Sequence, residues 1–450
     1  MTKTSDIRIC AVGTSTQHLK YRAPMKFGGR VVTDALLLDV TVDVETRSGC
    51  RGRGFGSMPM GNTWAWPSQC VSGEATLAAT EALGTRLTSL AGAHQGIGHP
   101  LEITHDLEAG YAAEADAITR QAALLEPMPR LAQLVAASPL EAAIHDAYGK
   151  ALGENSYNLL GPEFVNRDLS SYLGAEFAGE YLDRYTLRAP KAQMPLYHLV
   201  GALDLLTAAD LSGRLDDGLP ETLSEWIAFN GLTHLKIKLN GDDLAWDVDR
   251  VLAIDRVAAE AQAARGCAEW RYSADFNEKC GSVEYVLEFL ARIAAAAPPA
   301  LARLQYIEQP TNRDLRGNPA NRMHRAARIK PVVIDESLVD MESLLLSREL
   351  GYSGVALKAC KGHTGALLMA AAAQKYGMFL CVQDLTCPGA SFLHSASLAA
   401  RVPGVAAIEG NGRQYCPAGN RGWSERFPGM FHISDGMLRT ETLSGPGLGF

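Results

Sequence analysis

Residues 304–309 read LQYIEQ, and residues 332–336 read VVIDE; each is a short apolar run that ends in a carboxylate. Short runs of this kind are typical of buried parallel strands, which are apolar on both faces. Other runs downstream of residue 195 have the same form and end in charged or polar residues. The eight candidate strands, in chain order, are 196–203, 234–239, 271–276, 304–309, 332–336, 354–359, 379–384 and 405–410.

The steps between these candidate strands are roughly 20 to 40 residues long, enough for a helix and two turns in each crossover. Amphipathic segments at 244–264, 282–297 and 365–376 are predicted to be three of the crossover helices. A repeated strand–helix unit predicts a parallel α/β barrel over residues 191–410. In such a barrel the carboxyl ends of the strands form one rim, where catalytic side chains are found.

The first part of the sequence has a different texture. The first 45 residues favour strands, in particular the β-branched stretch 30–44, and predict a three-stranded meander. Residues 72–161 are rich in Ala and Leu at helical spacing, with helices expected at 113–125 and 139–153. Strands followed by helices predict an α+β domain over residues 1–190.

The composition argues against several classes of partner. The formal net charge of −8 leaves no basic face for a nucleic acid backbone. The nine cysteines are scattered without CxxC spacing, which fits a reducing compartment. No apolar run approaches the roughly 18 residues that a membrane span requires, and the N-terminus has no signal-peptide pattern. We therefore expect a cytoplasmic protein that acts on a small molecule.

Three consecutive strand ends carry carboxylates, namely Asp275, Glu308 and Asp335. The steps between them, roughly 30 residues each, correspond to one strand–helix unit, so the side chains converge on one part of the rim. Carboxylates held this close raise one another's pKa, and a hard divalent cation is the usual means of keeping them ionised. The trio therefore predicts an Mg²⁺ site, although any single member alone is better explained by a helix N-cap or a salt bridge to the next loop.

Three lysines end strands near this trio. Side chains alternate along a strand, so Lys236 and Lys238 share one face and point toward the barrel mouth. Lys358 ends the strand after Asp335, roughly opposite Lys238. An amine removes a proton next to a carboxylate only if the developing charge is stabilised, which a bound metal does. We interpret Lys238 and Lys358 as bases on two faces of one substrate and Lys236 as a partner of the carboxylates; solvated strand-end lysines are the alternative.

Five motifs resemble the muconate lactonizing enzyme subgroup of the enolase superfamily in their order and spacing. They are KIK (236–238), SADFN (273–277), IEQP (307–310), IDES (334–337) and LKAC (357–360). The resemblance covers about residues 195–410 and implies a modified TIM barrel of (β/α)7β type with an α+β capping domain. It also implies that residues 411–450 return to the cap.

The same resemblance assigns roles to residues. It implies that Mg²⁺ is bound by Asp275, Glu308 and Asp335, and that Lys238 and Lys358 are the acid/base pair. Glu336 lies on the opposite strand face, so we expect it to support the site. The histidine that the mandelate racemase subgroup carries after the seventh strand is missing, because this strand ends Gln383-Asp384-Leu385.

In this family two loops of the cap contribute specificity, and two Gly-rich segments resemble them by position. The segments are 21–29 and 54–62, and their glycines would permit hinge conformations. Arg22 and Lys26 are expected to meet an anionic or polyhydroxylated end of the substrate, although surface cations would explain them as well.

Other polar strand ends allow two interpretations. Gln383, Asp384 and Glu409 are candidates for hydrogen bonds to substrate hydroxyls or an ammonium group, with capping of the strand ends as the alternative. Trp64 and Trp66 could form a lid or pack in the core. We expect a homo-oligomer, because the loop that carries these tryptophans would offer apolar area to a second subunit.

The function expected from these residues is Mg²⁺-dependent removal of the proton next to a carboxylate through an enolate. The reaction would be racemisation or epimerisation, or a dehydratase elimination, with a weak preference for a hydroxy or sugar acid. A cycloisomerase and an epimerase of amino-acid or dipeptide derivatives are the alternatives within the superfamily. A Schiff-base aldolase barrel is a remote alternative, because three converging carboxylates have no role there.

Overall fold

A three-stranded antiparallel sheet opens the chain, as the sequence predicts. The computed structural model describes residues 3–27 and 30–450, and its first sheet has the order β1-β2-β3. The three strands are β1 (Ile7–Phe27), β2 (Arg30–Thr46) and β3 (Arg51–Pro59). In β2, Leu38, Val40, Val42 and Val44 are buried at alternate positions, so one face of the sheet packs on the core of the cap.

Six helices complete the cap, and one of them lies directly on the sheet. They are α1 (Asn62–Ala65), α2 (Gly73–Ala93), α3 (Pro100–Glu108), α4 (Tyr111–Gln121), α5 (Arg130–Leu152) and α6 (Ser170–Leu173). The expectation of a helix beginning at Pro139 is wrong, because Pro139 lies inside α5. Nearly all of α5 is buried, and this packing outweighs the backbone N–H that proline lacks.

Three glycines of β3 fit against the backbone of α5. A Cβ atom at Gly52, Gly54 or Gly56 would lie 2.3, 2.0 or 1.9 Å from a carbonyl oxygen of α5. These oxygens belong to residues four apart, and four residues of helix rise about as far as two residues of strand. The glycines of segment 54–62 therefore allow close packing of a strand on a helix, and the expectation of a hinge loop is wrong for residues 54–59.

Eight parallel strands close into a barrel, which confirms the predicted fold class. The barrel strands are β4 (Met194–Val200), β5 (His234–Lys238), β6 (Arg271–Asp275), β7 (Leu304–Glu308), β8 (Val332–Ile334), β9 (Gly354–Leu357), β10 (Phe379–Val382) and β11 (Val405–Glu409). Each pairs with the next along the chain, and β11 pairs with β4 to close the ring. A short strand, β12 (Met437–Leu438), adds antiparallel to β4.

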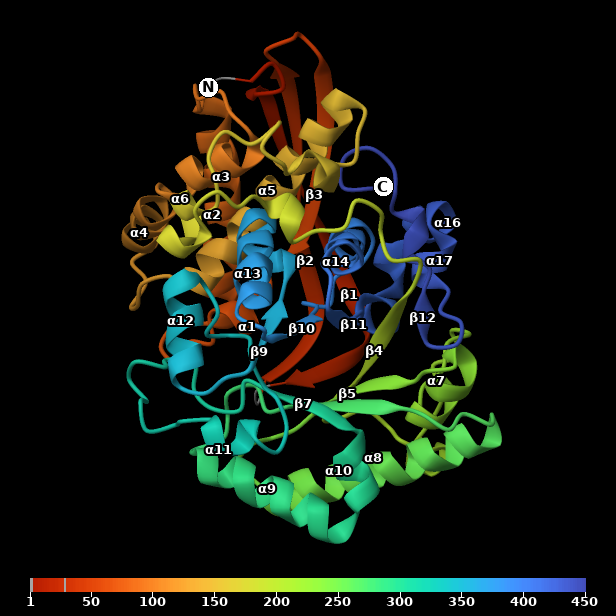
Figure 1. The fold of residues 1–450 in the computed structure, drawn as a ribbon. Coiled ribbons are helices and arrows are strands. Elements are labelled where there is room, and N and C mark those ends of the chain that lie inside the picture. The colour runs from red at the N-terminus through yellow and green to blue at the C-terminus, as the bar shows by residue number, and fades with distance from the viewer. Residues whose placement is uncertain (1–2, 28–29) are drawn as a thin grey trace.

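Helices surround this barrel (Figure 1). They are α7 (Leu223–Asn230), α8 (Leu244–Ala264), α9 (Val283–Ala296), α10 (Pro298–Arg303), α11 (His324–Ala327), α12 (Met341–Glu349), α13 (His363–Lys375), α14 (Ala390–Arg401), α15 (Gly412–Tyr415), α16 (Trp423–Arg426) and α17 (Pro428–Phe431). Near its end the chain meets the cap again, where the Leu448 backbone N–H donates to Asp146 of α5 at 3.0 Å. Among the described residues, none of the helices is both long and apolar enough to cross a membrane.

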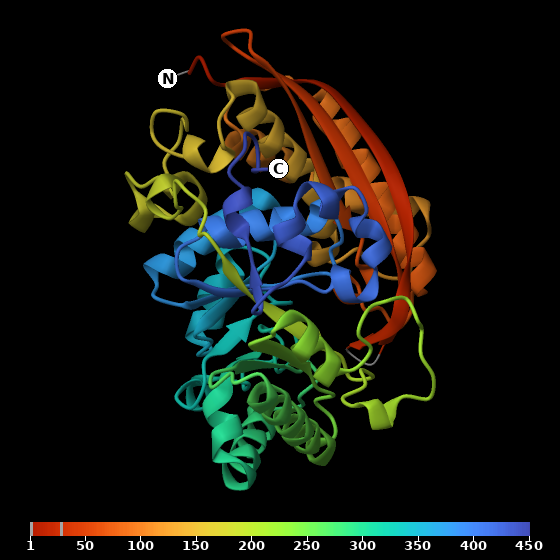
Figure 2. The same ribbon diagram turned by 90° about the vertical axis from the view of Figure 1, so that its right-hand side faces the viewer.

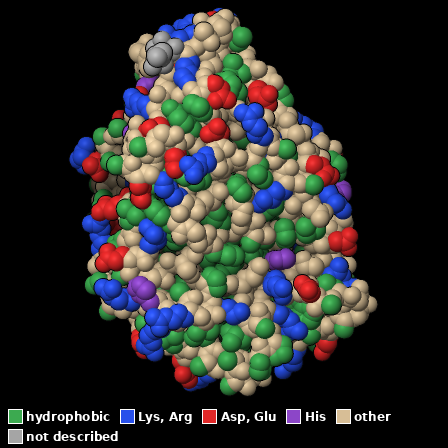
Figure 3. All heavy atoms as spheres, in the orientation of Figure 1, with side chains coloured by type: hydrophobic (Ala, Val, Ile, Leu, Met, Phe, Trp, Pro, Cys, Tyr) green, Lys and Arg blue, Asp and Glu red, His purple; other side chains and the backbone are tan. Residues whose placement is uncertain are grey.

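The long strands β1 and β2 run from the cap down to the barrel (Figure 2). Segment 21–29, expected to be a loop, is strand over residues 21–27, and Gly28 and Gly29 lie outside the described residues. On the face of the molecule in Figure 3, acidic and basic side chains are interspersed and neither gathers in one patch. This distribution agrees with the absence of a basic face in the sequence.

Candidate active site

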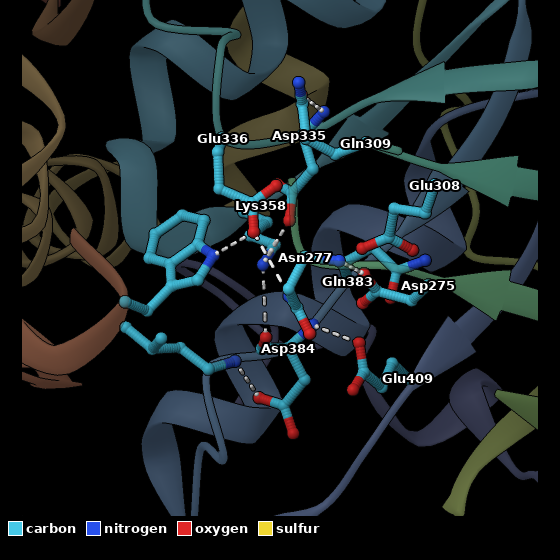
Figure 4. Close-up of polar contacts among 12 residues, drawn as sticks. Asp275, Asn277, Glu308, Gln309, Asp335, Glu336, Lys358, Gln383, Asp384 and Glu409 are labelled. Carbon is cyan, nitrogen blue, oxygen red and sulfur yellow. Dashed lines mark hydrogen bonds and ion pairs between the residues drawn. The ribbon is translucent and has the colours of Figure 1, made fainter. Parts of the chain in front are cut away.

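The three predicted carboxylates lie together at the carboxyl ends of neighbouring strands (Figure 4). Asp275 ends β6 and is paired in register with Glu308, which ends β7, while Asp335 directly follows β8. All three are almost fully buried. The Lys236 ammonium contacts both Asp275, at 3.1 Å, and Glu308, at 2.8 Å, so one cation bridges two members of the trio.

Two further lysines approach the trio from opposite sides of the barrel. Lys238 on β5 donates to Asp275 Oδ2 at 2.5 Å, and Lys358 after β9 lies 2.9 Å from Asp335 Oδ2. Strands β5 and β9 are four places apart in a ring of eight, which puts them across the mouth from each other. The structure therefore brings together the three predicted carboxylates and all three predicted lysines.

A fourth lysine, which sequence reasoning missed, also contacts the trio. Lys361 is buried and lies 3.1 Å from Asp335 Oδ1, and its ammonium donates to the Asp335 carbonyl at 2.5 Å. It reaches this position because a short 3₁₀ turn at Ala359–Lys361 follows the strand. The only signal in the sequence is a lysine three residues after Lys358.

Each of the two opposed lysines also faces an aromatic ring from the cap. The Lys358 ammonium lies 4.0 Å from the centre of the Trp64 ring, and the Lys238 ammonium lies 5.9 Å from the centre of the Phe27 ring. Such cation–π contacts stabilise an ammonium group and exclude water from it. The cap therefore forms part of the catalytic surroundings as well as a cover.

Glu336 connects the two lysines through hydrogen bonds to Asn277 and Trp64 and through the cation–π contact of Trp64 with Lys358. Its Oε1 accepts from the Trp64 indole N–H at 2.9 Å and from the Asn277 amide at 3.2 Å. Asn277 in turn accepts from Lys238 at 3.0 Å. The chain Lys238, Asn277, Glu336, Trp64, Lys358 thus runs around one side of the mouth, in line with the supporting role expected of Glu336.

The charges of the cluster act strongly on one another. Burial raises the pKa of Asp275, but the ammonium groups of Lys238 and Lys236 outweigh it and lower that pKa to about 2. Burial lowers the pKa of Lys358, but the neighbouring Asp335 carboxylate outweighs burial and leaves that pKa above its usual range. Burial and the neighbouring Asp275 together raise the pKa of Glu308 well above its usual value. The lysines therefore keep Asp275 and Asp335 ionised, but they do not offset the burial of Glu308, whose protonated form is favoured.

The donor set fits a hard divalent cation. Three carboxylates offer the oxygen ligands that Mg²⁺ prefers, and Glu308 Oε2 is buried with no hydrogen-bond partner among the described residues. In the described part of the chain no three His, Cys, Asp or Glu side chains are already placed to hold a metal ion. Lysine ammonium groups contact these carboxylates, so Lys238 and Lys358 would have to release Asp275 and Asp335 to a bound metal.

The remaining strand-end residues are occupied by the protein itself. Gln383 Oε1 accepts from Lys236 at 2.7 Å, and its amide donates to the Tyr306 hydroxyl at 2.5 Å. Asp384 accepts backbone N–H groups of Leu385 and Cys387 on one oxygen and of Asn411 on the other. Burial and Glu409 raise the pKa of Asp384 to about 6. Capping of backbone N–H groups therefore accounts for Asp384, and bonds to Lys236 and Tyr306 account for Gln383, without a bound substrate.

A cavity of about 500 Å³ lies above the lysines, between the barrel mouth and strands β1 and β2. Lys236, Lys238, Lys358, Asp384 and Glu409 line its floor. Glu409 accepts from Lys236 at 2.9 Å on one oxygen and from Asn411 at 2.7 Å on the other. The walls of the cavity come mainly from residues of the cap and the loop 385–386. The cap therefore lies where a substrate would extend.

Neither predicted cap cation lines this cavity. The Arg22 guanidinium forms an ion pair with Asp217 and donates to the Pro220 carbonyl at 3.1 Å, beside a different cavity. Lys26 alternates along β1 with Met25 and Phe27, the residues that do face the cavity. The expectation that Arg22 and Lys26 meet the substrate is therefore not supported by their positions.

The two tryptophans are buried within the chain. Trp64 is 5% exposed and Trp66 is 1% exposed, and the Trp66 indole N–H donates to Glu126 at 2.5 Å. The expectation that they offer apolar area to a second subunit is wrong, because both rings pack inside the monomer. Trp64 instead forms a wall of the site beside Lys358.

Comparison with known proteins agrees with this geometry. The family profile described as "Enolase C-terminal domain-like" matches residues 219–450. No curated protein matches the sequence. Solved structures of the same fold include a muconate lactonizing enzyme from Pseudomonas fluorescens complexed with muconolactone, with 18% identity, coverage of 98% of this chain and 96% of that chain, and a TM-score of 0.59.

Two other solved structures are similar over nearly their whole length. One is a substrate-liganded complex of the L-Ala-D/L-Glu epimerase from Bacillus subtilis, with 18% identity, 98% coverage of both chains and a TM-score of 0.61. The other is an enolase from Bradyrhizobium complexed with magnesium and mandelic acid, with 18% identity, coverage of 99% and 96%, and a TM-score of 0.60. At this identity the likeness establishes the fold.

Proposed function

Because this chain belongs to the enolase superfamily, in its mandelate racemase and muconate lactonizing enzyme group, we propose that it removes the proton next to a substrate carboxylate with the help of Mg²⁺. One observation carries the proposal. Lys238 and Lys358 stand on opposite sides of one cavity, and each is paired with a different member of one buried carboxylate trio. A substrate carbon held between them would present one face to each ammonium group.

The residues divide the work between them. Lys238 and Lys358 would take and return the proton, each in its neutral form when it acts as a base. Lys236 lies in the cavity floor, where its ammonium group holds Asp275, Glu308 and Glu409 together. Phe27 and Trp64 exclude water from the two bases, and Glu336 with Asn277 orients them.

Asp275, Glu308 and Asp335 would hold the Mg²⁺. When bound, the ion would stabilise negative charge that develops on the substrate carboxylate, which makes the neighbouring proton acidic enough for an amine. The observation that supports this is the crowding of three buried carboxylates with an unpartnered oxygen on Glu308.

The arrangement favours a proton transfer that uses both faces, as in racemisation or epimerisation. A β-elimination such as a dehydratase performs, or a cycloisomerisation, would use the same first step with one lysine as the base. The preference for a hydroxy or sugar acid depended on Arg22. Arg22 is ion-paired with Asp217 beside a different cavity, so this preference loses its support. An aldolase that forms a Schiff base is disfavoured because the three buried carboxylates beside the lysines have no role in it.

Exchange of the substrate α-proton with solvent tests the proposal. The protein is incubated with Mg²⁺ in D₂O with a panel of α-substituted carboxylic acids, and deuterium at the α-carbon is followed by NMR. We expect metal-dependent incorporation into at least one acid, whatever the later step. Absence of exchange from every acid in the panel would contradict it, and trapping of a substrate by borohydride would favour the aldolase.

Self-association stays a prediction, now without the support of Trp64 and Trp66. Barrels in symmetric oligomers are common, and light scattering at micromolar concentration measures the mass directly. A mass of one subunit would end this expectation.

A further inference from the structure

We propose that the substrate is a monocarboxylate whose α-carbon carries a bulky apolar substituent, which lies in the cavity between the barrel mouth and the cap. The inference rests on the proposed function for the position of the carboxylate at the trio. It goes further by inferring the rest of the substrate from the side chains that form the walls of the cavity in this chain.

The walls beyond the lysines are largely apolar. Tyr21, Met25 and Phe27 from β1 meet Trp64 from α1, and Leu385 closes the side next to the barrel. Further apolar side chains that line the cavity are Val31, Val32, Ala35, Leu36, Leu77 and Leu199. Burying an apolar substituent against such walls is favourable in proportion to the area removed from water.

The lysines of the cavity are confined to its floor. Among the described lining residues, they are Lys236, Lys238 and Lys358, all paired with carboxylates of the barrel mouth, and none is an arginine. Away from the floor the lining includes His18, which lies 3.6 Å from Asp34, and two acids, Asp34 and Glu74. A second carboxylate on the substrate would therefore lose hydration without gaining a lysine or arginine partner, and it would meet these acids.

Three polar side chains of the walls are already engaged. The Asn62 amide donates to the Gly73 carbonyl at 2.7 Å and to Thr76 at 2.9 Å. The Asn411 amide donates to Glu409, and the Thr386 hydroxyl lies 3.6 Å from Met25 Sδ. The remaining polar wall residues, Thr33, Asp34, Thr63 and Glu74, would pair with only some hydroxyls of a polyhydroxylated acid, and each buried hydroxyl left unpaired is costly.

The volume also favours a large substituent. A cavity of about 500 Å³ falls in the range of sites that enclose a ligand of drug-like size, well beyond a three- or four-carbon acid. Size, apolar walls and the confinement of the lysines to the floor thus point to one ligand chemistry.

Binding of matched unreactive acids to the Mg²⁺-loaded protein tests the inference without any turnover. Octanoate and octanedioate have the same length and differ in the second carboxylate, and gluconate supplies the hydroxyls. By isothermal titration calorimetry we expect octanoate to bind on the order of 10²-fold more tightly than either. Equal or tighter binding of octanedioate or gluconate would overturn the inference, as would failure of octanoate to bind at 10 mM.

A pair of variants adds a charge inside and outside the cavity. Val31 lines the cavity and is 55% exposed, whereas Leu125 is 79% exposed and lies elsewhere, so both tolerate lysine. Val31→Lys should shift the ratio of octanoate to octanedioate affinity roughly 3- to 10-fold toward the diacid, and Leu125→Lys should leave it unchanged. An equal effect of both variants would contradict the assignment of the cavity.

The same protein separates this inference from the proposed function. Deuterium exchange reports proton removal, and calorimetry reports what the cavity accepts. Preference for octanoate with no exchange of any α-substituted acid would leave the apolar cavity standing and remove the chemistry. Exchange that is fastest for diacids or sugar acids would support the proton-removal chemistry and contradict the inference of an apolar substituent.

Discussion

The mouth of the barrel and the seam between α5 and the barrel both bury titratable side chains, but they treat charge in opposite ways. We define the seam by Glu141 and His145 on α5 and His363 at the start of α13. At the mouth, each lysine contacts a carboxylate within about 3 Å. In the seam, Glu141 accepts from the Thr364 backbone N–H at 3.0 Å and from the Tyr111 hydroxyl, with no cation in contact.

The pKa values follow this difference. Burial raises the pKa of Glu141 to about 8, and burial lowers the pKa of His363 to about 3. Both side chains are therefore neutral near pH 7, whereas the mouth keeps Asp275 ionised. Burial of a titratable group thus does not mark a catalytic site by itself. A buried group that remains charged because it is paired is the stronger indication.

Removing the lysines of the mouth should have the largest effect. Lys238→Ala or Lys358→Ala is expected to lower the rate of proton exchange by on the order of 10² to 10⁴. If the enzyme is a racemase, each variant should still exchange the α-proton of one enantiomer through the remaining lysine. Rates are measured by NMR in D₂O for both enantiomers of the best substrate.

The seam supplies the control for this experiment. Glu141 is buried as deeply as Lys238 and Lys358 but does not line the cavity. The Glu141→Gln variant should therefore exchange the substrate proton at the wild-type rate. A double variant of Lys238 and Lys358 with near wild-type activity would remove both lysines from the mechanism.

The stability of the seam should depend on pH. Glu141 has its pKa raised in the folded state, so the folded protein holds a proton that the unfolded chain loses above about pH 4.5. Stability therefore falls as pH rises from about 4.5 to about 8, by on the order of several kcal/mol from this group. Glu141→Gln should flatten this part of the profile, as measured by urea unfolding at pH 5.5 and pH 8.

A partly exposed acid tests whether the effect belongs to burial. Glu114→Gln on α4 should leave the slope between pH 5.5 and pH 8 unchanged. If Glu141→Gln also leaves it unchanged, Glu141 is ionised in the folded protein and the contrast between seam and mouth fails.

Metal should stabilise the mouth and leave the seam untouched. With Mg²⁺ at 100 times its dissociation constant, the free energy of unfolding should rise by about 2.7 kcal/mol, and removal by EDTA should reverse the change. Glu308→Gln removes one proposed ligand and should abolish most of this shift. Glu141→Gln should keep it. Calorimetric melting of the three proteins with and without Mg²⁺ provides the measurement.

The smallest predicted effect concerns Trp64. Trp64→Phe keeps an aromatic ring next to Lys358 but loses the hydrogen bond to Glu336, worth about 1 kcal/mol. We expect a loss of about tenfold in kcat with little change in KM, because Lys358 is less well oriented. Trp66→Phe is the matched control, since its indole contacts Glu126 away from the cavity. Equal losses in both variants would point to general destabilisation.

The rim of the barrel could be predicted from the sequence because two simple rules fix it. Parallel strands end at one edge, and side chains alternate along each strand, so KIK and the three carboxylate ends had one arrangement available. Lys361 escaped prediction because its position depends on a single 3₁₀ turn after β9. No periodicity marks such a turn.

The cap face was predicted less well for a different reason. Gly28, Gly29 and Pro24 suggested a loop, yet Tyr21, Met25 and Phe27 alternate with polar neighbours as in a strand. Reading that alternation would have turned Arg22 and Lys26 away from the cavity. The sequence could not show which face of this strand meets the barrel, because a shift in register between Lys20 and Met25 depends on its pairing with β2.

Strand β1 is so long that a small rotation at one end would displace the other end appreciably. Its 21 residues, at about 3.4 Å each, follow a path roughly 70 Å long from the cap to the cavity. A tilt of about 3° at a pivot 50 Å away moves the far end by roughly 2.5 Å, which is more than the radius of a methyl group. A rotation of this size would displace Met25 and Phe27 in the cavity wall, and the Arg22–Asp217 ion pair ties this part of β1 to the segment between β4 and α7.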